Sequence, residues 1–363
     1  MQKAKLQNQN LPKGWRTVEL GEVVENFDSK RIPLSSMERA KIQGKYPYYG
    51  AAEIVDYINK YIFDGLYILI AEDGTVIANG NKPMLQLVDG KFWVNNHTHV
   101  IRGKNDLETK YLFYALKNTS IVPYITGAVQ LKLTQANLNK IKIPYPDNSK
   151  TRTKIASILS AFDDKIELNN KINKTLEEMA QAIFKEWFIK NQKAKIKKQK
   201  LGDLVNITYG KGPASNELKK SGYPVYGANG IIGYCDSYSC SDRQIIIGCR
   251  GVVGNITLTL PKCTITHNSL VLTPLNNRKI FLYYLLKNQK LDAIAGGSAQ
   301  PQITIRDLEN FELAIPDEKI QDKFESIVNI IEQKRLNNFY ENQKLAELRD
   351  LLLPKLMNGE IRV

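Results

Sequence analysis

The apolar positions between Thr151 and Lys193 recur at steps of three and four residues. Neither proline nor glycine occurs from Thr151 to Lys200, so the pattern predicts one long amphipathic helix. At about 1.5 Å per residue, roughly forty residues would extend for about 60 Å, which is too long for one small domain to cover. The stripe therefore needs a second helix. The stripe of this first helix consists of Ile155, Ile158, Phe162, Ile166, Ile172, Leu176, Met179, Ile183 and Trp187.

The C-terminal part of the chain repeats this stripe after a shift of 169 positions. We predict a second helix from Asp317 to Leu353 that ends at Pro354, because proline cannot continue a helix. The two stripes should pack against each other. The residues predicted to form this helix-pair interface are Ile158, Phe162, Ile172, Leu176, Ile327, Ile331, Leu345 and Leu348.

An asparagine interrupts both stripes at the same place, Asn169 in the first and Asn338 in the second. A buried asparagine in an apolar seam costs stability but penalises the wrong register. For either residue alone, a solvated interruption explains the pattern equally well. Because the interruption occurs in both copies, we favour a role in register.

The segments outside the two helices repeat as well. In each copy an aromatic Tyr-Pro-x-Tyr-Gly segment is followed by a β-rich run, a glycine-bearing turn and a short helical stretch. The paired segments are 46–51 with 223–228, 67–70 with 244–247, 73–74 with 248–251, and 110–116 with 280–286. The order along the chain is globular domain, helix, globular domain, helix.

We therefore predict an α+β protein with an internal pseudo-two-fold repeat. Two similar globular α/β domains are separated along the chain by the two long helices. The predicted parts are domain one at 1–150, the first helix at 151–193, a basic linker at 194–200, domain two at 201–316, and the second helix with the C-terminal tail at 317–363.

The net charge of +14 indicates a polyanionic partner, most simply nucleic acid, although ribosome-associated and membrane-surface proteins share this property. No apolar run approaches the roughly 18 residues of a membrane span, and the polar N-terminus shows no secretory signal. We expect a cytoplasmic protein. The four cysteines form no CxxC pair, which favours free thiols over a disulfide or a zinc site.

The order and duplication of these segments resemble the specificity subunits of type I restriction-modification systems. The similarity covers about residues 11 to 361. Besides the paired Tyr-Pro-x-Tyr-Gly segments, it is carried by Leu-Pro-Lys-Gly-Trp at 11–15 with Leu20 and Gly21, and by the helical stretches 154–166 and 352–361.

This resemblance implies two target recognition domains, each reading one half of a bipartite double-stranded DNA site. The long helices would pack antiparallel and set the unread spacer between the halves. Two methyltransferase subunits would dock on this scaffold, and translocase-nuclease subunits would join for cleavage. The second domain spans only about 115 residues, so it is a candidate for the shorter half-site.

Polar residues on the matching loops are the candidates for DNA binding. Lysine and arginine would position the domains on phosphates, and other polar side chains would reach base edges. A solvated or locally capping role is the alternative at each position. The candidates are Lys30, Arg31, Thr75, His97, Gln130 and Lys132 in copy one, and Lys211, Asn229, Arg250, Asn268, Gln300 and Gln302 in copy two. Gly50, Gly74, Gly227 and Gly251 are expected to serve the backbone, through positive φ or close approach.

A nuclease-like pattern occurs twice, as Pro-Asp at 146–147 before Asp-Asp-Lys at 163–165, and Pro-Asp at 316–317 before Glu-Gln-Lys at 332–334. The second half of each lies on a long helix, about 15 Å beyond the first, so the carboxylates should not converge on a metal. Helix capping explains the Pro-Asp pairs.

Other catalytic or metal-binding chemistry finds little support. His97 and His99 could share one face of a strand, but no third metal ligand is evident and copy two has Asn268 and Leu270 there. No cofactor-binding glycine loop, methyltransferase tetrapeptide or catalytic triad occurs. We expect a non-catalytic protein without cofactor or metal. Two alternatives remain: the specificity subunit of a fused methyltransferase-nuclease (type II) system, and a coiled-coil adaptor that does not bind DNA.

Overall fold

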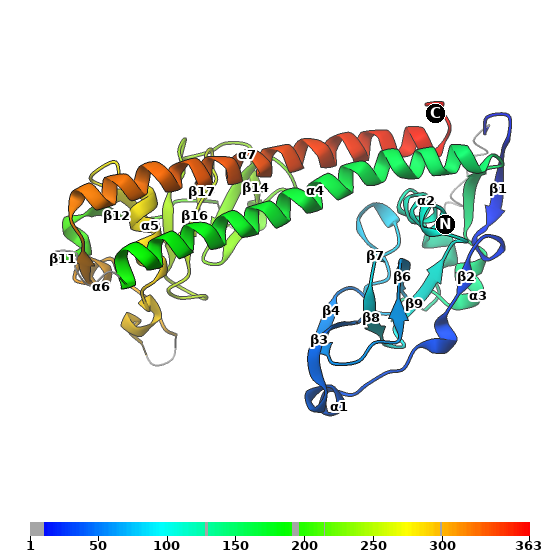
Figure 1. Ribbon diagram of the computed structural model, residues 1–363, viewed down its shortest axis with the longest axis horizontal. Helices are drawn as coiled ribbons and strands as arrows, with labels where there is room; N and C mark the ends of the chain where they lie inside the picture. The colour runs from blue at the N-terminus through cyan, green and yellow to red at the C-terminus, as the bar shows by residue number, and fades with distance from the viewer. Residues whose placement is uncertain (1–10, 128–129, 191–195, 214, 298–299) are drawn as a thin grey trace. The chain divides into compact units, whose positions relative to one another are not determined.

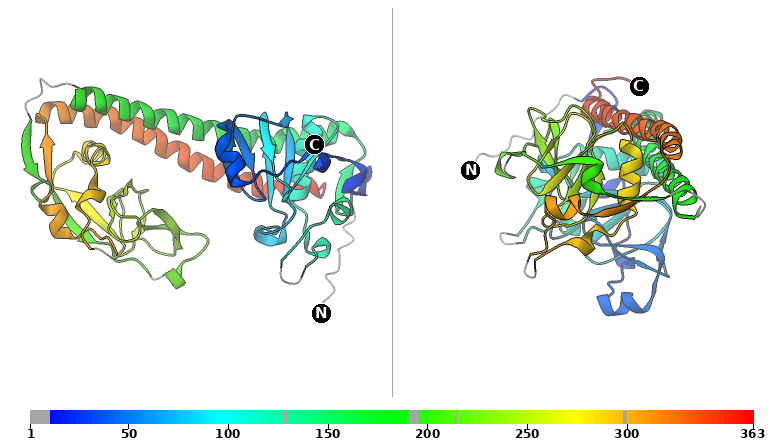
Figure 2. Two further views of the ribbon diagram at one scale, coloured as in Figure 1. Left: turned by 90° about the horizontal axis from the view of Figure 1, so that it is seen from below. Right: turned by 90° about the vertical axis from the view of Figure 1, so that its left-hand side faces the viewer.

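The computed structural model describes residues 11–127, 130–190, 196–213, 215–297 and 300–363. The chain forms two compact units (Figures 1 and 2). Unit 1 comprises Met1–Glu167 and Glu341–Val363, and unit 2 comprises Leu168–Tyr340. Each unit contains one globular domain and a stretch of each of the two longest helices, α4 (Ser149–Phe184) and α7 (Glu318–Met357).

The globular domain of unit 1 is built on three small sheets. The first has the order β2-β9-β6-β7, the second β4-β3-β8-β5, and the third pairs β1 with β10. In the second sheet β3 runs antiparallel to β4 and parallel to β8. The strands are β1 (Trp15–Glu19), β2 (Glu25–Asn26), β3 (Gln43–Tyr49), β4 (Ile54–Ile58), β5 (Phe63–Asp64), β6 (Tyr67–Ala71), β7 (Leu85–Val88), β8 (Lys91–Val94), β9 (Thr98–Arg102) and β10 (Lys142–Pro146).

Short helices connect these strands. The Asn105 side chain caps α2 by accepting a hydrogen bond from the Glu108 N–H, as expected for an N-terminal cap. The helices are α1 (Ser36–Lys41), α2 (Asp106–Lys117) and α3 (Gln135–Asn139), with 3-10 turns η1 (Leu20–Glu22), η2 (Asp28–Lys30), η3 (Asn79–Asn81) and η4 (Val122–Tyr124).

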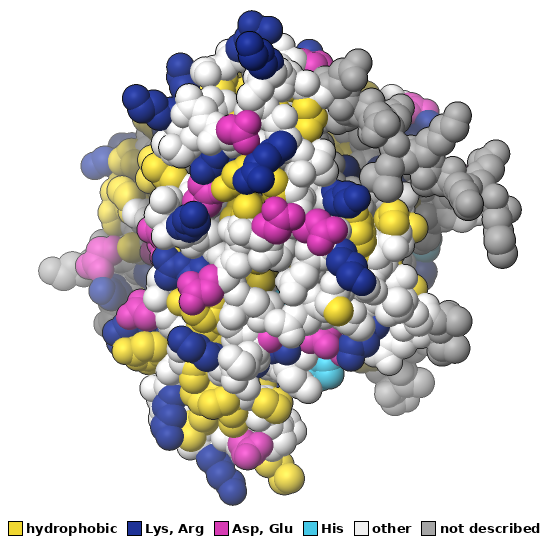
Figure 3. Space-filling view, turned by 90° about the vertical axis from the view of Figure 1, so that its right-hand side faces the viewer, with side chains coloured by type: hydrophobic (Ala, Val, Ile, Leu, Met, Phe, Trp, Pro, Cys, Tyr) yellow, Lys and Arg dark blue, Asp and Glu magenta, His cyan; other side chains and the backbone are white. Residues whose placement is uncertain are grey.

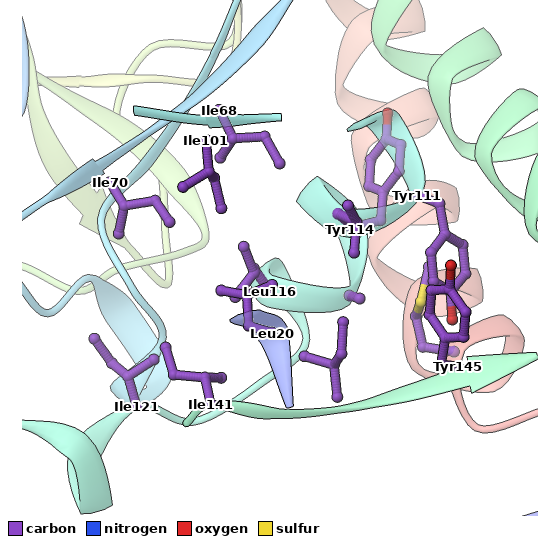
Figure 4. Close-up of a cluster of buried hydrophobic side chains, with 14 of the residues drawn as sticks. Leu20, Ile68, Ile70, Ile101, Tyr111, Tyr114, Leu116, Ile121, Ile141 and Tyr145 are labelled. Atoms are coloured by element: carbon purple, nitrogen blue, oxygen red, sulfur yellow. The ribbon is translucent and has the colours of Figure 1, made fainter. Parts of the chain in front are cut away.

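The main core of unit 1 joins this domain to both long helices. Figure 4 shows part of it, with Ile68, Ile70 and Ile101 of the first sheet on one side and Tyr111 and Tyr114 of α2 on the other. The long helices contribute Ile155, Ala156 and Leu159 from α4, and Leu353, Leu356 and Met357 from α7. Part of the predicted stripe is therefore buried against the domain itself and not only against a second helix.

Unit 2 repeats this topology. Its sheets have the orders β12-β18-β15-β16, β14-β13-β17 and β11-β19. As in unit 1, the aromatic strand β13 runs antiparallel to the following strand β14 and parallel to β17. The strands are β11 (Lys197–Lys200), β12 (Val205–Tyr209), β13 (Tyr223–Gly227), β14 (Gly230–Cys235), β15 (Ile245–Gly248), β16 (Ile256–Leu258), β17 (Thr264–Ile265), β18 (Ser269–Pro274) and β19 (Glu312–Ile315). The predicted α+β class and the internal repeat are confirmed.

The core of unit 2 is rich in aromatic side chains. Phe184 of α4 packs edge-on against Phe324 of α7 with ring centroids 5.6 Å apart, and both contact Tyr284 of α5. The helical elements of this unit are α5 (Lys279–Lys287), α6 (Ile305–Glu309), a π-helical segment η5 (Lys185–Lys190) that follows α4, and 3-10 turns η6 (Leu201–Asp203), η7 (Ser215–Glu217) and η8 (Leu291–Ile294).

Within each unit the stretches of α4 and α7 run antiparallel. In unit 1 an ion pair joins Asp163 to Arg349. In unit 2 the Asn338 amide donates a hydrogen bond to Asn173 Oδ1 at 2.9 Å, and Arg335 binds Glu177 at 2.8 Å. Asn169 and Asn338 are both buried, as a register role requires.

Two predicted helix boundaries need correction. The second helix does not end at Pro354 but continues to Met357, because burial of Leu356 and Met357 in the unit 1 core offsets the lost backbone hydrogen bond. The first helix begins at Ser149, and Asn148 rather than Asp147 provides a side-chain acceptor to its first turn. The predicted end of this helix at Lys193 lies outside the described residues.

Two further expectations were wrong in part. Residues 197–200 of the predicted linker form β11, whose backbone pairs with β19 in the way that β1 pairs with β10; residues 194 and 195 lie outside the described residues. In the predicted helix-pair interface, Ile327 and Leu348 are 37% and 49% exposed. The predicted Ile331 does pack inward, and the residues of α7 that share its inward face are Phe324 and Val328, at the same helical spacing.

Among the helices in the described part of the chain, none combines the length and apolarity that a bilayer crossing requires.

Candidate nucleic-acid interface

In unit 1, three loops meet where the central strand β6 ends. The Glu72 N–H donates to the His97 carbonyl at 2.9 Å, and the Leu133 N–H donates to the Glu72 carbonyl at 2.8 Å. A backbone bridge joins Asp73 to Lys132. We call these segments, residues 72–75, 95–99 and 130–133, together with the turn 28–31 bound to them, loop cluster 1.

A buried polar pair lies beneath loop cluster 1. His99 is 1% exposed, with Nδ1 2.6 Å from Asp28 Oδ2 and Nε2 2.7 Å from the Leu133 carbonyl. Both ring nitrogens of His99 therefore face oxygen atoms of neighbouring segments. Burial alone would raise the pKa of Asp28, but hydrogen bonds from His99 and the Val100 N–H, with the charges of His99 and Arg31, lower that pKa overall.

Arg31 holds these loops together. Its guanidinium donates to Glu72 Oε2 at 2.8 Å, to the Thr98 carbonyl at 2.9 Å and to the Asp28 carbonyl at 2.9 Å. The side chain is only 14% exposed. Arg31 would reach DNA only by giving up these contacts. In the structure its role is therefore to connect the loops of the cluster.

The two histidines of the His-Thr-His motif have separate surroundings. His97 is 51% exposed and places Nδ1 2.9 Å from both carboxylate oxygens of Asp73, whereas His99 is buried against Asp28. They do not form a metal pair, and the described residues contain no cluster of three or more potential metal ligands. The remaining candidates of copy one, Lys30, Thr75, Gln130 and Lys132, are exposed on these loops or beside them.

Loop cluster 2 of unit 2 has the same backbone frame. The Cys249 N–H donates to the Asn268 carbonyl at 2.9 Å, and the Ile303 N–H donates to the Cys249 carbonyl at 3.1 Å. Loop cluster 2 consists of residues 249–251, 266–269 and 300–303, together with residues 228–229. Asn255 connects residues 228–229 to the cluster, because its side-chain amide donates a hydrogen bond to the Ala228 carbonyl at 3.1 Å. Cys249 therefore corresponds to Glu72, and Arg250 corresponds to Asp73.

The candidates of copy two lie around this frame. Arg250 donates from Nε to Gln302 Oε1 at 3.3 Å, and both line a surface hollow with Gly251, Gln300 and Pro301. Asn229 and Asn268 are exposed on the same cluster. Lys211 is exposed and lies between two glycines whose backbone N–H groups donate hydrogen bonds. Gly210 donates to the Ser269 carbonyl, and Gly212 donates to the Ile265 carbonyl. The structure thus brings together loops that are far apart in sequence.

The four glycines serve the backbone as expected. Gly74 and Gly251 have positive φ angles of 70° and 76°. A Cβ at Gly50 would lie 2.6 Å from a Val55 methyl group, and one at Gly227 would lie 2.9 Å from an Ile232 methyl group. Side chains are therefore disfavoured at all four positions, for two different reasons.

Two carboxylates of the nuclease-like pattern, Asp163 and Glu332, are bound by side chains of their own unit. Asp163 accepts a hydrogen bond from Tyr114 and pairs with Arg349. Glu332 accepts from Tyr284 and pairs with Arg243 and Arg335. These contacts tie α2 and α5 to the long helices. Sequence reasoning missed them, although both tyrosines and both carboxylates occupy matching positions of the repeat.

Basic side chains are spread over the one face of the molecule that Figure 3 shows. On the face in Figure 3, lysine and arginine side chains alternate with acidic ones and form no single large patch. The net charge of +14 therefore supports attraction to a polyanion in general, whereas the arrangement of polar loops defines the candidate site.

Comparison with known proteins finds the same family in both halves of the chain. The family described as type I restriction modification DNA specificity domain matches residues 12–178 and again residues 193–349. A putative type I restriction enzyme specificity subunit of Haemophilus influenzae is 29% identical, over 92% of this chain and 94% of its own length. The MjaIX specificity subunit of Methanocaldococcus jannaschii is 25% identical, over 96% of both chains.

The fold is also found in a solved structure. The type I restriction-modification S subunit of M. genitalium superimposes with a TM-score of 0.65 at 21% identity and covers 97% of both chains. That similarity bears on the fold, and the two matches to the family span most of the sequence. This chain belongs to the family of type I restriction-modification specificity subunits, and it contains two copies of the family's DNA specificity domain.

Proposed function

We propose that this chain is the DNA sequence-specificity subunit of a type I restriction-modification complex. Residues 1–150 and 201–316 are its target recognition domains, and each reads one half of a bipartite double-stranded site. As a specificity subunit the chain is not itself an enzyme. It works in the cytoplasm, where methyltransferase and translocase-nuclease subunits meet genomic DNA.

The observation that carries this proposal is the relation between the two loop clusters. The two backbone hydrogen bonds that join the three loops are the same in both clusters, whereas the polar side chains differ: His97 and Lys132 in cluster 1 correspond to Asn268 and Gln302 in cluster 2. A shared frame with different polar groups suits the reading of two different half-sites, because base edges are distinguished by their patterns of donors and acceptors.

The long helices supply the second part of the proposed function. Their paired stretches would hold the unread gap between the halves constant. Apolar residues that remain exposed on them, such as Ile330 of α7 at 72% and Leu351 of α7 at 57%, support docking of two methyltransferase subunits.

An exchange of domains tests the proposal. Residues 201–316 would be replaced by the corresponding segment of another specificity subunit, and the chimaera would be expressed with the methyltransferase of this system. Methylation mapping should show an unchanged first half, an unchanged gap and a new second half. The reciprocal exchange of residues 11–146 is the matched control and should change the first half alone. A change in both halves from one exchange would contradict independent reading.

A further inference from the structure

Arg250 occupies a position in loop cluster 2 that the fold equates with Asp73 in loop cluster 1. Each follows the residue that links the three loops, Cys249 or Glu72, and each precedes a glycine with positive φ. The two copies therefore present side chains of opposite charge from one backbone position.

Each of these side chains is paired with a residue from a neighbouring loop. Asp73 accepts a hydrogen bond from His97 Nδ1, and Arg250 donates one from Nε to Gln302 Oε1 at 3.3 Å. In cluster 1 the more exposed partner is His97, which Asp73 orients. In cluster 2 the exposed group is Arg250 itself, and Gln302 is the partially buried residue that orients it.

Because Gln302 binds Arg250 through Nε, the two terminal nitrogens of the guanidinium remain available to bind a base. Among the residues that the structure describes, Gln302 is the hydrogen-bond partner of Arg250, and neither Nη1 nor Nη2 donates to a protein acceptor. A guanidinium held at Nε has its plane constrained, while Nη1 and Nη2 remain as a fork of donors. Arg250 lines a surface hollow together with Gly251, Gln300 and Pro301.

The backbone around the fork lets a base come close. Gly251 has φ of 76°, and a Cβ built there would meet nothing within 4 Å. The position after Arg250 is therefore open space. A bidentate arginine fork matches the O6 and N7 acceptors of guanine in the major groove, which is the commonest specific contact between an arginine and a base.

We propose that Arg250, oriented by Gln302, reads a guanine in the half-site of the second recognition domain. Gln302 is a positioning residue in this arrangement. The proposal rests on the proposed function and names the base and the residues for one position of the target. The first half-site is read at the corresponding place by a different group, His97 oriented by Asp73.

Methylation mapping of variants, expressed with the methyltransferase of this system, tests the assignment. Arg250→Ala should relax one guanine of the second half to any base, with loss of about tenfold or more in preference, and leave the first half unchanged. Gln302→Ala should weaken the preference at the same position. Arg306→Ala, which removes an exposed arginine of the same domain, should leave the motif intact.

Binding measurements with modified DNA cover the case in which Arg250→Ala abolishes methylation. The purified complex of chain and methyltransferase would be titrated with its target and with a duplex carrying 7-deazaguanine, which lacks the N7 acceptor. The wild type should lose affinity for the modified duplex, whereas Arg250→Ala should bind both duplexes equally weakly. Co-purification of the variant with the methyltransferase verifies that it folds.

The outcomes separate the two proposals. A split wild-type motif, combined with an Arg250→Ala variant that keeps full guanine preference or remains sensitive to 7-deazaguanine, would overturn the assignment of Arg250 alone. A wild-type motif that is not split would instead overturn the proposed function.

Discussion

The hydroxyl group of Tyr114 donates a hydrogen bond to Asp163 Oδ2 at 2.6 Å, and Tyr284 makes the same bond to Glu332 Oε1 at 2.8 Å. In each unit the tyrosine lies on a helix of the recognition domain and the carboxylate lies on a long helix. Arginines complete both sites, Arg349 in unit 1 and Arg335 in unit 2. Each domain is thus fixed to the helical scaffold by a charge-assisted contact, which is partly buried in unit 1 and buried in unit 2.

Replacing Tyr114 with phenylalanine should destabilise the protein by about 1.5–3 kcal/mol, because a hydrogen bond to a charged group is lost from a partly desolvated site. Tyr284→Phe should have a similar effect. Chemical denaturation of the purified variants would measure this loss. Tyr57→Phe, at a tyrosine that is half exposed, is the matched control and should change stability by less than about 0.5 kcal/mol. Equal stability of Tyr114→Phe and Tyr57→Phe would contradict the structural role.

Asp28→Asn should cost about 3 kcal/mol or more, because it leaves His99 buried without its carboxylate partner. The folded-state pKa of Asp28 is lowered, so its stabilising contribution is present above the unfolded pKa of about 3.9 and is lost as the pH falls further. Urea denaturation at several pH values should show the difference between wild type and variant shrinking below about pH 4. Asp64→Asn, at an exposed carboxylate, is the control. A difference that stays constant down to pH 2 would argue against this linkage.

Asn338→Leu should destabilise unit 2 by about 1–3 kcal/mol, since Asn173 Oδ1 would lose its donor in a partly buried seam. Replacing Asn173 and Asn338 together with leucine should cost less than the sum of the single changes, because no amide then remains without its partner. A double-mutant cycle by denaturant unfolding would measure this coupling. Additive effects would show that the asparagine contact contributes nothing specific.

Shortening both long helices should change the gap between the half-sites and not the halves themselves. We would remove four residues of α4 between Lys165 and Asn173 and four of α7 between Asn338 and Arg349. At about 1.5 Å per residue this shortens each helix by about 6 Å, or about two base pairs of B-DNA. Methylation mapping of the double deletion should give the same two halves around a shorter gap. An unchanged gap would exclude the helices as its determinant.

The fold could largely be predicted from the sequence because the same pattern of segments occurs in both halves of the chain. The shared stripe and the matching Tyr-Pro-x-Tyr-Gly segments predicted the order of the elements and both long helices. Local rules failed where tertiary contacts decide. Pro354 lies inside α7 because Leu356 and Met357 are buried beyond it, and lysines 197, 198 and 200 belong to a strand because β19 offers a partner.

The candidate site was predicted only as a set of loops. Their polar residues are carried on matching segments, but the partner of each side chain depends on loops that are distant in sequence. Arg31 was expected to contact DNA, yet Glu72, which is 41 positions away, engages its guanidinium. Asp73 was treated as a turn residue, yet it orients His97 from 24 positions away. No spacing rule connects such pairs.

The most direct test of this account is methylation mapping in cells that express the chain with the methyltransferase of its own system. We predict one split motif: two short specific sequences separated by a fixed gap of unspecified bases, with the second half containing a guanine that depends on Arg250. A continuous motif, or an active methyltransferase whose methylation shows no motif, would contradict the reading of two half-sites by two recognition domains.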